Sequence, residues 1–142
     1  MSSKTIGTTR IVPFTLQEIF HVFEDPEILA RWWGPEGFTN TFTEFEFRPD
    51  GKWSFVMHGP DGANYPNEWI FRTTDVGLIV IEHFTDHHFM LTMMFMAREG
   101  GTHIFWTQEF DDAEVAEKLR PFCEPGNEQN LDRLEAVLSG KL

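Results

Sequence analysis

Residues 45–71, FEFRPDGKWSFVMHGPDGANYPNEWIF, carry the strongest structural signal in this chain. Phenylalanines alternate with charged residues through 44–48, and large apolar residues occupy every second position through 53–57. An apolar face that alternates with a polar one is typical of antiparallel strands covered on one side and exposed on the other. A Pro-Asp-Gly turn signal follows each segment, so the stretch predicts consecutive antiparallel strands joined by hairpins.

The same pattern continues as far as residue 110. Further turn signals, TDVGLI, FTDHHF and EGGTHI, recur at a spacing of about ten to fifteen residues. They separate segments of strand length, which are EWIFRTT, LIVIEHF, FMLTMMFMA and HIFWTQEF. With a β-branched segment near the start of the chain, KTIGTTRIV, the count comes to about seven strands.

Two short helices are expected between the first strand and the remaining ones. Thr15 and Glu18 match the T-x-x-E capping box that begins a helix. For a second helix, Asp25 is a suitable N-cap, Pro26 suits the first helical position, and the Gly-Pro at 34–35 ends it.

The end of the chain is helical in pattern and favours an α+β fold. AEVAEKLRP forms a first helical piece, which Pro121, Pro125 and Gly126 are expected to interrupt. The following segment, NEQNLDRLEAVLSGKL, has leucines along one stripe and Gly140 as its stop. This order predicts a curved antiparallel sheet whose concave side is filled by the last helix. Space left between helix and sheet would form a pocket.

Composition limits the partners and the compartment. The chain has 142 residues, the size of one domain, so residues 1–142 are expected to form a single domain. A net charge of −12 disfavours nucleic acids and anionic membranes as partners. No apolar run approaches the length of a membrane span, and the opening MSSKTIGTTR has no apolar signal region. With Cys123 as the one cysteine, these features predict a cytoplasmic protein.

Four motifs, taken together in their order and spacing, resemble a known family. They are the W-W-G-P of ILARWWGPEGFT, the turn before Trp53, the M-x-G-P-D-G that begins at Met57, and the G-G-T of GGTHIFWTQEF. They resemble the SRPBCC superfamily (START-like, birch-pollen-allergen-like), in the branch of activator of heat-shock-protein-90 ATPase homologues. The resemblance covers essentially the whole chain. It implies a helix-grip fold, in which a seven-stranded antiparallel sheet wraps a long C-terminal helix and encloses a cavity.

Two departures from the family pattern affect the cavity. The family's R-x-G-G turn is Arg48-Pro49-Asp50-Gly51 here, which keeps the turn chemistry. Asn127 follows Gly126 where the family often has an aromatic residue, which alters the pocket at that end. The heat-shock co-chaperone itself carries an additional N-terminal domain for which this chain has no room, so ATPase activation is not expected.

The leading hypothesis is a cavity that binds a small hydrophobic, ring-containing ligand of unknown identity. Strand alternation places aromatic residues of two neighbouring strands on one concave face, and the resemblance places residues 32–38 at the mouth of the cavity. Of the adjacent tryptophans, Trp32 is expected to anchor its helix and Trp33 to face the opening. The expected ligand-binding residues are Trp33, Phe38, Phe45, Trp53, Phe55, Met57, Tyr65, Trp69, Phe71, Phe122, Asn130 and Leu134. The alternative is that these residues form an ordinary core.

A second hypothesis is a cofactor-free cyclase, aromatase or hydrolase in the same cavity, although binding without catalysis is favoured. Gln108 and Glu109 are neighbours on the last strand, so one of them faces inward. A carboxylate in an apolar cavity has a raised pKa and can act as a general acid or base. Glu109 is therefore one catalytic candidate and the Tyr65 hydroxyl is another. The competing interpretation is a solvated Glu109 on the outer face.

A third hypothesis is a protein-interaction module of the stress or co-chaperone kind. Its anchor would be whichever of Trp32 and Trp33 is exposed. In addition, an apolar outer face on residues 89–97 would favour a homodimer.

Neither a metal nor a cofactor is expected. His83, His87 and His88 surround the TDHH turn, but no cysteine or carboxylate lies at ligand spacing, and Asp86 alone would give little support to metal-bound imidazoles. The sequence has no Gly-rich phosphate loop, no G-x-S-x-G elbow and no H-E-x-x-H motif, so cofactor-dependent and triad chemistries lack support.

Overall fold

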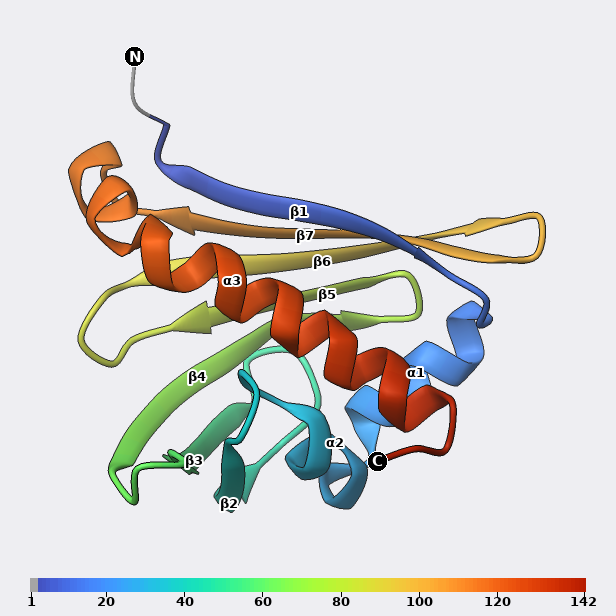
Figure 1. Ribbon diagram of the computed structural model, residues 1–142, viewed down its shortest axis with the longest axis horizontal. Coiled ribbons are helices and arrows are strands. Elements are labelled where there is room, and N and C mark those ends of the chain that lie inside the picture. The colour runs from blue at the N-terminus through green and yellow to red at the C-terminus, as the bar shows by residue number, and fades with distance from the viewer. Residues whose placement is uncertain (1–2) are drawn as a thin grey trace.

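A curved antiparallel sheet of seven strands is the frame of the molecule, which a computed structural model describes for residues 3–142. The strands lie in the order β1-β7-β6-β5-β4-β3-β2, so the first strand pairs with the last (Figure 1). Their bounds are β1 Thr5–Val12, β2 Thr39–Phe45, β3 Lys52–His58, β4 Asn64–Asp75, β5 Leu78–His83, β6 Phe89–Arg98 and β7 Gly101–Phe110. This is the α+β, seven-stranded arrangement that the turn spacing predicts.

The register of β3 and β4 confirms the expected alternation. Trp53 pairs with Trp69, and Met57 pairs with Tyr65, so the large residues of the two strands share one face. Bulges interrupt the register at Phe42/Glu44 in β2 and at Phe71/Thr73 in β4. Such bulges bend the strands that carry them, which helps the sheet to curve around a helix.

Both short helices begin with the caps that the sequence predicts. Before α1 (Leu16–Glu24), the Thr15 hydroxyl accepts from the Glu18 amide at 3.1 Å, and Glu18 accepts in return from the Thr15 amide at 3.0 Å. Before α2 (Pro26–Trp32), the Asp25 carboxylate accepts from the Glu27 amide at 3.0 Å. These bonds satisfy amide groups that have no partner inside the helix.

The long last helix, α3 (Ala113–Leu138), runs through Pro121 and Pro125 without a break, so the expected interruption is wrong. A proline inside a helix removes one backbone hydrogen bond and bends the axis, but packing on both sides can hold the helix together. Ala116 before the prolines and Leu131 after them are both completely buried. In Figure 1 the first turns of α3, in orange, point in another direction from the rest, which crosses the sheet diagonally.

The expected stop of α3 at Gly140 is confirmed. Gly140 has a φ of 74°, and the Lys141 amide reaches back to the Ala136 carbonyl at 2.8 Å. This is the left-handed glycine cap that commonly ends helices. None of the helices in residues 3–142 is both long and apolar enough to cross a membrane.

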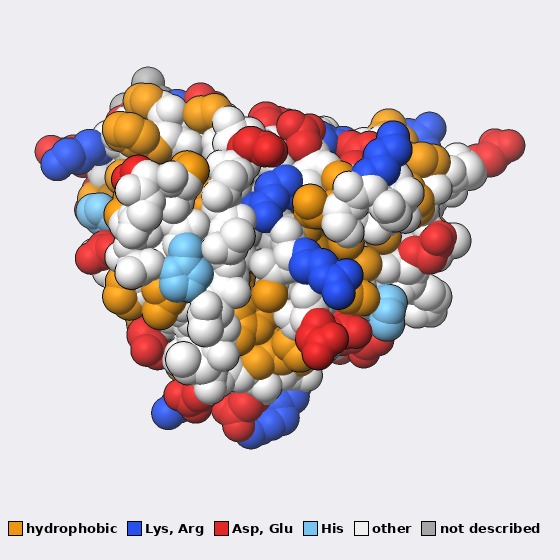
Figure 2. All heavy atoms as spheres, turned by 60° about the horizontal axis from the view of Figure 1, so that its bottom comes forward, with side chains coloured by type: hydrophobic (Ala, Val, Ile, Leu, Met, Phe, Trp, Pro, Cys, Tyr) orange, Lys and Arg blue, Asp and Glu red, His pale blue; other side chains and the backbone are white. Residues whose placement is uncertain are grey.

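Charged side chains are distributed over the surface in two different ways. On the face shown in Figure 2, acidic and basic side chains are intermixed around small apolar areas. On the outer surface of the sheet, five side chains form a chain of ion pairs. It runs Asp50–Arg72–Glu82–His88–Asp111, with N–O distances of 2.8, 2.8, 2.6 and 2.7 Å.

His88 is the titratable link in this chain, because each of its ring nitrogens faces a carboxylate. The hydrogen bonds to Glu82 and then to Asp111 hold the pKa of His88 above its ordinary value of 6.5. The bond from His88, assisted by Arg72, holds the pKa of Glu82 below its ordinary value of 4.5.

Replacing His88 with Gln should remove stability that depends on pH. Because folding raises the pKa of His88, its contribution is complete below about 6.5 and is lost as the pH rises through the higher folded-state pKa. The contribution of Glu82, whose pKa is lowered, fades only in acid, below about 4.5. In urea denaturation, the wild type should therefore exceed His88→Gln in free energy of unfolding at about pH 6, and the difference should narrow toward about pH 9.

His103→Gln is the matched control, because His103 stacks on Phe105 at a ring distance of 4.2 Å and forms no ion pair within residues 3–142. If the difference in free energy of unfolding between the wild type and His88→Gln widened with rising pH, the raised pKa of His88 in the folded state would be contradicted.

Candidate functional site

The chain between α2 and β2, residues 31–38, is held by one buried side chain from the other end of the sequence. Arg133 lies on α3, is 9 % exposed, and directs its guanidinium into the turn. It donates hydrogen bonds to five backbone carbonyl oxygens. These belong to Arg31 (2.7 Å), Trp33 (3.1 Å), Gly34 (3.0 Å), Pro35 (2.8 Å) and Phe38 (2.9 Å). The end of α2 and the turn after it thus share one donor.

Two asparagines complete this arrangement. Asn130, one turn before Arg133, donates to the Trp32 carbonyl at 3.0 Å. Asn40 on β2 donates to the carbonyls of Ala30 at 3.0 Å and Trp33 at 2.9 Å. The last carbonyls of a helix have no partner within the helix, so side chains from two other elements satisfy them here.

The Arg133 guanidinium is buried without a carboxylate within ion-pair distance among residues 3–142. Burial lowers its pKa below the ordinary value, with Glu36 opposing part of this effect, but an arginine remains protonated at neutral pH. Its position suits a cation, because the C-terminal end of a helix carries partial negative charge.

The two adjacent tryptophans have different destinations, as expected. Trp32 is fully buried, donates from its indole nitrogen to the Val22 carbonyl at 3.0 Å and meets the Phe23 ring edge-on at 4.9 Å. Trp33 is 4 % exposed and lies on the concave face of the sheet. Because neither indole is exposed, the proposed tryptophan anchor for a partner protein is wrong.

Trp33 is surrounded by the other tryptophans of the sheet. Its ring lies 5.1 Å from that of Trp53, 5.9 Å from that of Trp69 and 5.8 Å from that of Trp106. Gly34 follows with a φ of 95°, and a Cβ there would stand 2.6 Å from the Met57 methyl group. The backbone after Trp33 is therefore close against the sheet.

A pocket of about 200 Å³ lies between this turn, the concave face of the sheet and the middle of α3, residues 122–130. It is lined by Trp33, Gly34, Pro35, Met57, Trp69, Phe89, Leu91, Trp106, Gln108, Phe122, Cys123, Gly126, Asn127 and Asn130. Five of these belong to the expected ligand-binding set, namely Trp33, Met57, Trp69, Phe122 and Asn130. Phe122 is 76 % exposed, which places its ring at the solvent side.

The other seven expected residues lie outside this pocket. Trp53, Phe55, Phe71 and Leu134 are buried in the core, and Phe45 is packed against it. Phe38 and Tyr65 face each other at a ring distance of 6.0 Å, and Tyr65 is 45 % exposed. Trp53 in particular packs against the Trp33 indole at a ring distance of 5.1 Å. For these seven residues, contact with a ligand stays a prediction.

Of the polar residues that line the pocket, the sequence predicted Asn130 but not Gln108, Asn127 or Cys123. Gln108 is buried and accepts from the Asn127 amide at 2.8 Å, which joins β7 to α3. The strand alternation of β7 contained the signal, since Gln108 shares its parity with Trp106, but it left open which neighbour faces inward. Glu109 is exposed on the other face of the sheet.

The pocket lining contains no acidic, basic or histidine side chain. Cys123 lines it, and burial raises the pKa of its thiol, an effect that Gln108 and Arg120 only partly oppose. The Glu109 carboxylate lies on the other face of the sheet, and Tyr65 does not line the pocket. Neither catalytic candidate named from the sequence therefore lines this pocket.

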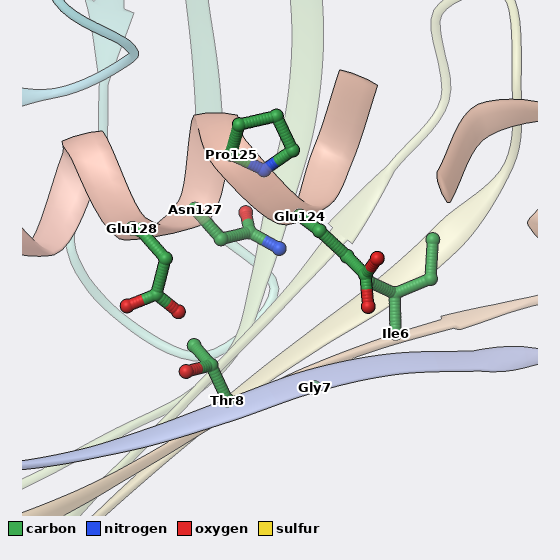
Figure 3. A pocket seen from close by; sticks show the side chains of 7 residues that line it. All are labelled: Ile6, Gly7, Thr8, Glu124, Pro125, Asn127 and Glu128. Atoms are coloured by element: carbon green, nitrogen blue, oxygen red, sulfur yellow. The ribbon is translucent and has the colours of Figure 1, made fainter. Parts of the chain in front are cut away.

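A second hollow, of about 250 Å³, lies between β1 and the opposite side of α3. Figure 3 shows its lining, which is Ile6, Gly7, Thr8, Glu124, Pro125, Asn127 and Glu128. Its two carboxylates have basic neighbours, because Arg10 lies 3.0 Å from Glu128 and Arg120 lies 3.7 Å from Glu124. No expected ligand-binding residue lines it.

The histidines of the TDHH turn are engaged in local bonds. His83 contacts the His87 carbonyl at 2.7 Å, and His88 bridges two carboxylates. Within residues 3–142, no three His, Cys, Asp or Glu side chains are grouped as they would be to hold a metal ion.

The fold and this pocket define a class of protein, the helix-grip domains, in which a curved antiparallel sheet closes around a C-terminal helix. Residues 13–139 match the family described as "Activator of Hsp90 ATPase homolog 1-like protein", and the chain belongs to this family. No curated protein matches the sequence.

Several solved structures share the fold. A solution structure from Arthrobacter aurescens is 24% identical, covers 97% of this chain and 87% of its own, and has a TM-score of 0.89. A crystal structure from Nitrosomonas europaea is 16% identical over 97% of this chain and 96% of its own, with a TM-score of 0.85. The AHSA1 protein from Silicibacter pomeroyi is 19% identical over 97% and 99%, with a TM-score of 0.76.

Arg133→Met should destabilise the protein by about 3 kcal/mol, because it leaves several carbonyls of the turn without a donor. Arg133→Lys should restore only part of the loss, since an ammonium group cannot reach five acceptors in the plane of a guanidinium. Urea denaturation measures both values. Arg98→Met, at an exposed position, is the control and should change stability by less than about 0.5 kcal/mol. Equal stabilities of Arg133→Met and Arg98→Met would contradict the role of the guanidinium.

Proposed function

We propose that this protein binds a small hydrophobic, ring-containing molecule in the pocket between the sheet and α3. The observation that carries the proposal is the pocket of about 200 Å³, whose wall holds Trp33, Trp69, Trp106 and Phe89 with few polar groups. Binding sites for small molecules are typically concave, aromatic in lining and furnished with a few polar groups. A cavity of about 150 Å³ accommodates a benzene-sized ligand, so this pocket suits a compound of one or two rings.

Residues 1–142 would act as a single ligand-binding domain. We place this activity in the cytoplasm, because a protein with one cysteine, Cys123, needs no oxidising compartment for its structure. Catalysis is not part of the proposal, since the pocket lining includes no Asp, Glu, His, Lys or Arg.

Gly126 offers a way to close the pocket from its helical wall. A Cβ at this position would meet only Pro35, at an ordinary contact distance of 3.7 Å, so the space beside it is open. Gly126→Phe should fill the pocket and weaken binding of naphthalene at least about tenfold. Gly126→Ala should retain binding and increase helix stability by about 0.5 to 1 kcal/mol.

Binding would be followed by the chemical shifts of the tryptophan indole groups during titration with naphthalene, and circular dichroism would confirm that both variants are folded. If the wild type shows no saturable binding, or if Gly126→Phe binds as the wild type does, the proposal fails.

A second copy of the chain is the partner we propose for the outer face of the sheet. Met94 and Met96 on β6 and Ile11 on β1 are exposed there, between 43% and 55% of each residue. Exposed apolar groups of this kind favour association. Met96→Lys should then shift a dimer toward monomer in sedimentation equilibrium, whereas Val76→Lys, an exposed apolar position in the β4–β5 turn, should not. A wild type that is monomeric at all accessible concentrations would refute this.

A further inference from the structure

The polar groups of the pocket are all neutral, and this restricts the charge of a ligand that can bind there. Gln108, Asn127 and Asn130 contribute amides, and Cys123 contributes a thiol that burial keeps protonated. The remaining lining residues are apolar or aromatic side chains and Gly-Pro backbone. A charged ligand would lose its hydration on binding without meeting an opposite charge, which costs several kcal/mol.

The surroundings do not supply the missing charge. Two carboxylates of α3, Glu124 and Glu128, line the hollow beside β1 and not the pocket, and they lie near Arg120 and Arg10. The buried Arg133 directs its donors to backbone carbonyls. The net charge of −12 adds a general repulsion of anions.

The three amides do not use all of their hydrogen-bonding groups on the protein. Asn127 donates one N–H to the Gln108 carbonyl oxygen at 2.8 Å, which leaves the Asn127 carbonyl oxygen for another partner. Gln108 directs one amide N–H to the Cys123 thiol and keeps the other. Asn130 uses its amino group on the Trp32 carbonyl, which leaves its own carbonyl oxygen. One ligand hydroxyl could donate to an Asn oxygen and accept from Gln108 at the same time.

We infer that the ligand is an uncharged one- or two-ring compound whose hydroxyl or carbonyl group binds the Gln108–Asn127 amide pair while its ring lies on Trp33, Trp69 and Trp106. This inference rests on the proposed function and specifies the ligand class of the same pocket. An aromatic wall also attracts organic cations through the faces of its rings. The absence of a carboxylate from the lining favours the neutral compound.

The test compares four probes that share one ring system: naphthalene, 2-naphthol, 2-naphthoate and 2-naphthylmethylammonium. At neutral pH the wild type should bind 2-naphthol about five- to tenfold more tightly than naphthalene, the usual gain from one hydrogen bond. It should bind 2-naphthoate and the ammonium probe at least about tenfold more weakly than 2-naphthol. Isothermal titration calorimetry measures all four affinities.

Gln108→Leu removes the amide and keeps nearly the same volume. It should lose the preference, so that 2-naphthol and naphthalene bind this variant with equal affinity. Gln129→Leu is the matched control, because Gln129 accepts from the Glu36 amide at 3.1 Å and does not line the pocket. This control should keep the wild-type preference.

The outcomes separate the two proposals. If neither naphthalene nor 2-naphthol binds, the proposed function itself fails. If naphthalene binds but the carboxylate or the ammonium probe binds more tightly than 2-naphthol, the pocket stands and the neutral ligand class is overturned. If Gln108→Leu keeps the preference for 2-naphthol, the amide pair is not the anchor.

Discussion

The structure depends on the contact between the Arg133 guanidinium and the backbone of residues 31–38. Helix α2 has only seven residues, so its terminal carbonyls need donors from elsewhere. Arg133 and Asn130 supply them from α3, about a hundred residues later in the chain. The contact joins the long helix to the loop that carries Trp33, and it therefore sets the distance between the helix and that side of the sheet.

The position of Trp33 divides the concave side of the sheet into two parts. Over β3 its indole covers Trp53, and that part is solid aromatic core. Toward β6 and β7 its other side faces Trp106 and the middle of α3, where the pocket remains.

The two halves of α3 differ in burial and in backbone hydrogen bonding. The half after Asn127 is held by Arg133 and by fully buried leucines, Leu131 and Leu134. The half before it contains Pro121 and Pro125, lacks two backbone donors, and provides the wall with Phe122, the most exposed large apolar residue described. Fewer hydrogen bonds make a helix easier to open locally, so the pocket has its weaker wall on the solvent side.

Much of the fold could be read from local patterns, because caps, turns and strand alternation each depend on residues that are near in sequence. Thr15 and Asp25 predicted the two short helices, and the turn signals between residues 48 and 103, with the alternation of the segments between them and the β-branched first segment, predicted the seven strands. The site could be read only in part. Met57 and Trp69 follow from strand parity, whereas Phe89 and Trp106 were not predicted, and Gln108, Asn127 and Arg133 gain their roles from partners on distant elements. Long-range packing also decided two features that the sequence left open or predicted wrongly. The helix α3 continues through its two prolines, and Glu109 lies on the outer face of the sheet, because each depends on which face of its element the folded chain buries.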